Sequence, residues 1–107
     1  MYTVEISLEL FHGPIWVYSP SGTPERDFPL IYDDPVLAEL DKQAEEMFNM
    51  YYEIDSHDMP CWFDEEKQKA EKDQMLDIIS KIKARLDEIN DGSFVVEDYV
   101  TEGLKNL

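Results

Sequence analysis

The chain has 107 residues, which is the size of a single domain. It carries 25 aspartate and glutamate residues against 9 lysine and arginine residues, so its formal net charge is −16. This charge repels phosphates, so we expect no direct binding to nucleic acid or to an anionic membrane surface. Hydrophobic residues make up 43% of the chain and aromatic residues 12%, which provides a core and excludes a disordered acidic tail.

The cysteine content and the apolar runs predict a cytoplasmic protein. Cys61 is the single cysteine, so the chain forms no internal disulfide and suits a reducing compartment. No apolar run approaches the roughly 18 residues that span a bilayer. The first residues lack the basic start and the unbroken apolar stretch of a secretory leader, so we expect none.

The first third of the chain predicts a β-hairpin followed by a loop. Apolar and polar side chains alternate over residues 2–10, which is the period of a half-buried strand. A turn at residues 12–14 separates this segment from a second strand over residues 15–18, so we expect antiparallel pairing. Three prolines and a glycine predict a loop over residues 19–29. Residues 30–32 are either a short third strand or the lead into a helix.

Two amphipathic helices are predicted next. Asp34 is an N-cap and Pro35 a first-turn proline, and the apolar spacing after them predicts a helix of about 20 residues ending near Asp55. Residues 56–63 look irregular. A second helix is predicted over residues 64–89, with carboxylates in its first turn. Ala70 is the only apolar residue in its first ten positions, so that half either projects into solvent or contacts a partner.

The last segment completes the predicted fold. Residues 94–100 have the β-branched and aromatic content of a strand. The order of elements predicts one α+β domain over residues 1–107. We expect a small antiparallel sheet, made of the N-terminal hairpin and the C-terminal strand, with two antiparallel helices packed on one face.

The acidic residues are concentrated in one part of the sequence. Residues 33–66 carry twelve acidic residues and one basic residue, whereas residues 67–86 carry three acidic and six basic ones. Asp41 and Glu45 are four apart on the predicted helix, a like-charge spacing that destabilises it. Solubility or a generally acidic proteome accounts for such an excess without a function. The functional alternative is an electrostatic footprint for a basic surface of another protein.

The predicted partner-binding residues come from this acidic stretch and from the aromatic residues beside it. Interfaces are enriched in tryptophan and tyrosine, and aromatic rings next to carboxylates suit contact with arginine and lysine. The alternative for Trp62 and Phe63 is that they belong to the core. In the second strand, Trp16 and Tyr18 alternate with Ile15 and Val17, so we expect one pair to face the core and the other to face outward. The predicted binding residues are Glu39, Glu45, Glu46, Glu53, Asp55, Asp58, Glu65 and Glu66, with Tyr52 and Trp62 as aromatic anchors.

The sequence contains candidate metal ligands but no complete catalytic or metal-binding motif. Asp55, His57, Asp58 and Cys61 have metal-ligating side chains, but their spacing fits no structural zinc site. A calcium loop beginning at Asp55 fails because Pro60 occupies the position that needs glycine. No basic or helix-start environment activates Cys61 as a nucleophile, and no phosphate-binding glycine loop occurs. We therefore expect no metal, no cofactor and no enzymatic activity.

In composition the chain resembles the small acidic inhibitors used in microbial conflict. These include immunity proteins that block nuclease toxins, and phage or mobile-element proteins that block nucleic-acid-binding defence enzymes. The resemblance implies a non-enzymatic inhibitor that occupies a basic surface of a nuclease or other nucleic-acid-binding enzyme by mimicking nucleic acid. The alternative is a structural or assembly subunit that uses the helical hairpin as a protein–protein interface.

Overall fold

A computed structural model describes residues 1–9, 12–56 and 59–107, without the side chains of residues 53–56 and 59–62. The described elements form one elongated body of 47 × 25 × 24 Å. In chain order they are β1 (Tyr2–Ile6), β2 (Ile15–Tyr18), α1 (Pro29–Tyr32), α2 (Pro35–Asn49), β3 (Tyr52–Ser56), β4 (Met59–Phe63), α3 (Glu65–Ala70), α4 (Lys72–Ile89), β5 (Phe94–Asp98) and α5 (Thr101–Lys105).

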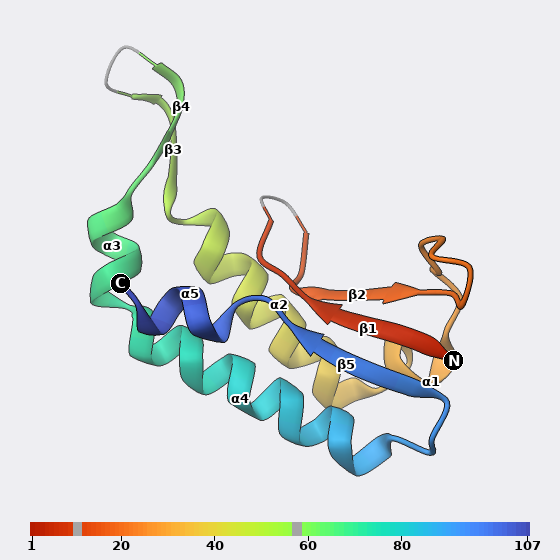
Figure 1. The fold of residues 1–107 in the computed structure, drawn as a ribbon. Helices are drawn as coiled ribbons and strands as arrows, with labels where there is room; N and C mark the ends of the chain where they lie inside the picture. Colours follow the sequence, from red (N-terminus) through yellow and green to blue (C-terminus); the bar gives the residue numbers. More distant parts are fainter. Residues whose placement is uncertain (10–11, 57–58) are drawn as a thin grey trace.

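A three-stranded sheet in the order β2-β1-β5 forms one layer, and the helices lie on one side of it (Figure 1). The hairpin of β1 and β2 is antiparallel, as predicted. The last strand differs from the prediction, because β5 pairs with β1 in parallel and makes the sheet mixed. The reason is the path of α4, which brings the chain back to the end of the sheet where β1 begins. There the backbone N–H of Tyr2 donates to the Ser93 carbonyl at 2.9 Å.

The core lies between the inner face of this sheet and the helix pair α2 and α4. Burial alternates along β1 and β2. In β2, Ile15 and Val17 are buried and Trp16 and Tyr18 lie on the outer face, which confirms the prediction that one of these two pairs faces outward. The buried core residues of the sheet are Val4, Ile6, Ile15, Val17 and Phe94, and those of α2 and α4 include Leu37, Leu40, Ala44, Phe48, Met75, Ile79, Ile82 and Leu86. The α+β class and the antiparallel helix pair are therefore confirmed.

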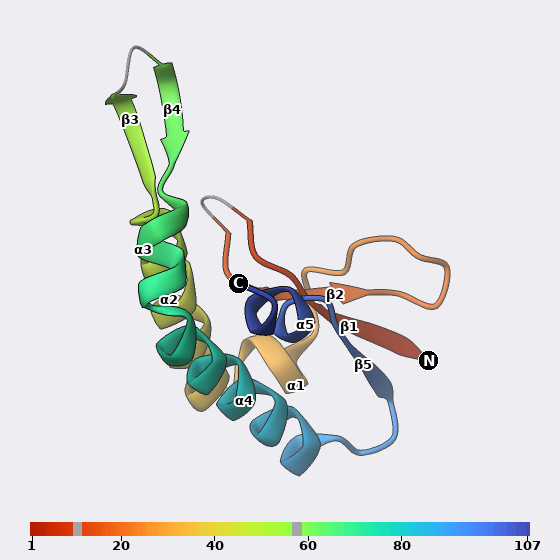
Figure 2. The same cartoon turned by 60° about the vertical axis from the view of Figure 1, so that its left-hand side comes forward.

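The segment after α2 differs from the prediction. The helix ends at Asn49 rather than near Asp55, and the stretch predicted to be irregular contains β4, which pairs with β3 in an antiparallel hairpin. The two strands contain the aromatic residues Tyr52, Trp62 and Phe63 and the β-branched Ile54, which favour strands, and the cross-strand pairing satisfies backbone groups of the segment. Apolar spacing alone did not distinguish these residues from another helical turn. The hairpin projects from the end of the helix pair (Figures 1 and 2).

Three smaller features complete the chain path. Residues 29–32 form the short helix α1, so residues 30–32 are not a third strand; they form a separate helix just before α2, which neither alternative predicted. The second predicted helix is divided at Glu71 (φ −102°, ψ 8°) into α3 and α4. The helix α5 follows β5 and was not predicted. Among the described residues, no helix has both the length and the apolar character needed to cross a membrane.

Candidate functional site

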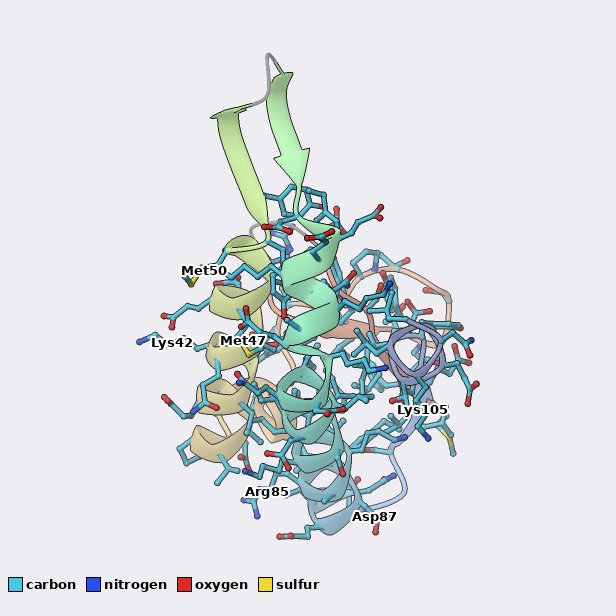
Figure 3. The ribbon with its side chains drawn as sticks, turned by 90° about the vertical axis from the view of Figure 1, so that its left-hand side faces the viewer. Lys42, Met47, Met50, Arg85, Asp87 and Lys105 are labelled. Carbon is cyan, nitrogen blue, oxygen red and sulfur yellow. The ribbon has the colours of Figure 1, made fainter. Side chains whose placement is uncertain are left out.

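The acidic residues of α2 are distributed over two sides of the helix. Glu39 and Glu46 are two helical turns apart and exposed, so they share the outward face. Figure 3 shows this face, because the labelled Lys42 and Met50 point away from α4 while Met47 points toward it. Glu45 is half-buried and lies on the side of the helix nearer to the sheet. The structure therefore brings Glu39 and Glu46 together but separates Glu45 from them.

Asp41 has a structural role on that side of α2. Its carboxylate accepts a hydrogen bond of 3.1 Å from the backbone N–H of Ile15, at the start of β2. The carboxylate also lies against Gly13, where an added Cβ would be 1.9 Å from Asp41 Oδ2. Burial raises the pKa of Asp41, and the charge of Glu45 acts in the same direction. The predicted proximity of these two like charges therefore adds to the effect of burial on Asp41.

Strands β3 and β4 carry four of the predicted binding residues, of which the first, Tyr52, belongs to the aromatic cluster at the base of the hairpin. Glu53 and Asp55 lie on β3, and Trp62 lies on β4 opposite Glu53 in the backbone register. Their side chains, and Asp58 altogether, lie outside the described residues. The same holds for the side chains of His57 and Cys61, so the structure describes no geometry for the metal or thiol chemistry considered above.

An aromatic cluster joins the base of this hairpin to α2. Tyr52 is half-buried, and its ring centroid lies 4.9 Å from that of Phe63 and 5.5 Å from that of Phe48. Tyr51 is fully buried beside them, and burial, together with the charge of Glu71, raises its pKa to about 12. Tyr52 is therefore packed against the body and exposes only part of its ring, and Phe63 is half-buried in the same cluster.

Glu65 and Glu66 are exposed in the first turn of α3, next to the hairpin. The helix is capped by the side chain of Asp64, which accepts from the Lys67 backbone N–H at 3.0 Å. Acidic side chains are favoured at this end because the helix dipole is positive there. These two carboxylates therefore have a local structural reason for their position, in addition to any role in binding.

The ion pairs of the described residues divide the surface by charge. All four take their cation from α4, and they are Lys81–Asp77, Lys83–Asp98, Arg85–Asp34 and Arg85–Glu88. By contrast, no ion pair in the described part of the chain involves Glu39, Glu45, Glu46, Glu65 or Glu66. Lys81, Lys83 and Arg85 of α4 thus pair with carboxylates of α4, of β5 and of the N-cap of α2, and the five glutamates remain without an ion pair among the described residues.

The outer face of the sheet is a second surface, which the sequence analysis did not propose as a site. Glu5 and Glu97 are in register on β1 and β5, and Trp16 is in register with Glu5 on β2. Tyr99 follows β5 and is 62% exposed. The alternation along residues 2–10 placed Glu5 on this face, but its proximity to Glu97 depends on parallel pairing, which the sequence did not predict.

An apolar groove of about 430 Å³ lies between the hairpin base and α5. Its lining residues include Leu8, Phe48, Tyr52, Phe63, Leu104 and Leu107. Among the residues whose side chains are described, no group of three or more histidine, cysteine, aspartate or glutamate residues is arranged to hold a metal ion.

Comparison with known proteins gives no relative from which a function can be transferred. No family model, curated protein or solved structure matches this chain.

Proposed function

We propose that this protein is a non-enzymatic binding protein whose acidic surface occupies a basic surface of a target protein. The observation that supports the proposal is the set of unpaired glutamates on α2 and α3, beside a projecting hairpin whose sequence adds three more acidic residues. A helix shaped only by stability would place several lysines among such residues, as α4 does. On this face of α2, Lys42 is the single basic residue, and none of the ion pairs of the described residues involves it. Glu39 accepts a hydrogen bond of 3.1 Å from the Gln43 side chain, but no ion pair of the described residues involves Glu39 or Glu46, so both charges are available to a partner.

The target class follows from the same charge. A surface that attracts carboxylates at several points also attracts phosphates, so a nuclease or other nucleic-acid-binding enzyme is the target we propose. At low salt, an acidic surface of this kind steers a basic partner toward it and raises the association rate. Occupation of the phosphate-binding surface by Glu39, Glu46 and the hairpin would block access of nucleic acid, which is the mode of action of an immunity or anti-defence inhibitor.

The proposal is tested by capture from host lysate with the tagged protein. Beads are washed at low salt and then at about 0.5 M NaCl, where the screening length has fallen to a few ångströms. We expect a basic nucleic-acid-binding protein in the salt eluate, and we expect the purified chain to inhibit its binding to nucleic acid. Salt-resistant recovery of the chain itself or of a neutral partner would contradict this proposal and favour an assembly subunit.

A matched pair of variants tests the assigned face. The double variant Glu39→Lys/Glu46→Lys reverses two charges on the outward face of α2, and we expect it to weaken binding about tenfold or more. Asp27→Lys/Asp87→Lys changes the net charge equally at two exposed acidic residues outside the predicted set. Asp87 lies on the side of α4 away from that face (Figure 3). Equal weakening by both variants would show that net charge, and not this face, controls binding.

A further inference from the structure

The outer face of the sheet carries two carboxylates side by side. Glu5 and Glu97 are direct neighbours in the parallel pairing of β1 and β5, and neighbouring strands are about 4.8 Å apart. Like charges in this position destabilise a sheet. None of the ion pairs of the described residues involves either carboxylate. The fold therefore maintains an unfavourable pair for which a cation from another molecule would compensate.

Aromatic side chains border this pair on two sides. Trp16 lies across from Glu5 on β2, where its indole N–H donates to the Ser7 carbonyl at 3.0 Å and its ring stacks on His12 with centroids 3.6 Å apart. On the other side, the Tyr99 hydroxyl donates to the Glu97 carboxylate. Both rings are thus fixed by contacts of their own beside the carboxylates.

No element of the described chain covers this face. The helices pack on the opposite face of the sheet, and the outward side chains Val95 and Tyr99 are 45% and 62% exposed. A flat guanidinium group suits this combination, because it can bond to two carboxylates in one plane while lying against an aromatic ring. An ammonium group has no such plane, which favours arginine over lysine as the occupant.

We propose that this face binds an arginine side chain of a protein partner, with Glu5 and Glu97 as the charge acceptors and Trp16 and Tyr99 as the aromatic walls. The face lies across the sheet from α2, so this inference goes beyond the proposed function and does not depend on it. A partner that occupied both surfaces would have to reach around the molecule, so the arginine site is tested separately.

The test is an NMR titration of the ¹⁵N-labelled protein with the tripeptide acetyl-Gly-Arg-Gly-amide. We expect saturable shifts of the Trp16 indole N–H and of the backbone at residues 97–99, with the indole signal assigned through Trp16→Phe. Glu5→Gln/Glu97→Gln should raise the dissociation constant about tenfold, because both charged acceptors are lost. The same peptide with citrulline, which is neutral and of the same shape, should give no saturable shift.

The matched control is Asp27→Asn/Asp87→Asn, which removes the same charge at two exposed carboxylates outside both proposed surfaces and should leave the peptide affinity within about twofold. Equal weakening by both double variants, or shifts spread equally over α2 and α3, would overturn the arginine site and leave only general attraction of cations. Both variants keep the shape of the side chain, and thermal unfolding monitored by circular dichroism checks that each is folded. Failure here would not affect the salt-dependent capture that tests the proposed function.

Discussion

At the residue scale, Asp98 connects three elements. Its carboxylate accepts from the backbone N–H groups of Val100 (2.8 Å) and Thr101 (3.0 Å) at the start of α5, and it pairs with Lys83 of α4 at 3.0 Å. Burial by itself would raise the pKa of Asp98. The hydrogen bonds from Thr101, Val100 and Lys83 outweigh burial and lower the pKa to about 2.

The effect of Asp98 on stability should depend on pH. Because the pKa is lowered in the folded state, the carboxylate stabilises the fold above the unfolded value of 3.8, and this contribution is lost as the pH falls toward 2. We expect Asp98→Asn to lower the free energy of unfolding by about 2 kcal/mol at pH 7. Urea unfolding at pH 7, 5 and 3 should show the difference narrowing only below pH 4. A difference that stays constant over this range would contradict the assignment.

Gly13 and Asp41 should show energetic coupling. Gly13 has no positive φ angle, so alanine is compatible with its backbone, but the new Cβ would displace the Asp41 carboxylate from the Ile15 N–H. We expect Gly13→Ala to cost about 1–2 kcal/mol in the natural chain through the loss of that partly buried hydrogen bond. In an Asp41→Ala background the same substitution should cost less than half as much, as measured by a double-mutant cycle. Additive costs would mean that Gly13 is needed for another reason.

At the element scale, the hairpin of β3 and β4 is attached to the helices through Phe63. Its ring lies 5.9 Å from that of Phe48 and 6.0 Å from that of Tyr51. We expect Phe63→Ala to cost about 2 kcal/mol and to speed amide hydrogen exchange in the hairpin more than in α4. Phe28→Ala is the matched control, since Phe28 is also half-buried but contacts Tyr2 and Phe94 of the sheet. Its effect on hairpin exchange should be small, and an equal effect would mean that the hairpin unfolds only with the whole domain.

The elements were predictable where the pattern was local. Asp34 caps α2 as expected, accepting from the Leu37 N–H at 3.0 Å, and the alternation in β1 and β2 matches their burial. The ion pair of Asp34 with Arg85 was not predictable, because it joins residues brought together only by helix packing. For the same reason, the direction of β5 depends on the path of α4 and not on the composition of residues 94–98.

At the scale of the whole molecule, the excess of acidic residues is evident from the sequence, but only part of their arrangement on the folded surface could be predicted. Helical spacing put Glu39 and Glu46 on one face and could have separated Glu45 from them. The local pattern carried no information on the pairing of Glu5 with Glu97, because that pairing joins strands from the two ends of the chain in the sheet. The fold therefore determines which carboxylates lie together and which cations neutralise them.

The net charge predicts how stability responds to salt. With a charge of −16 and four ion pairs among the described residues, repulsion between carboxylates outweighs attraction. Raising NaCl from 10 mM to 0.3 M shortens the screening length from about 30 Å to about 6 Å, so distant repulsion is removed while close pairs are less affected. We expect the free energy of unfolding to rise by about 1 kcal/mol, with a Tm about 4–8 °C higher. Tetramethylammonium chloride should act equally if screening is the cause, whereas stabilisation by sodium alone would indicate a bound cation. A fall in Tm would mean that the ion pairs of α4 dominate the electrostatics of the fold.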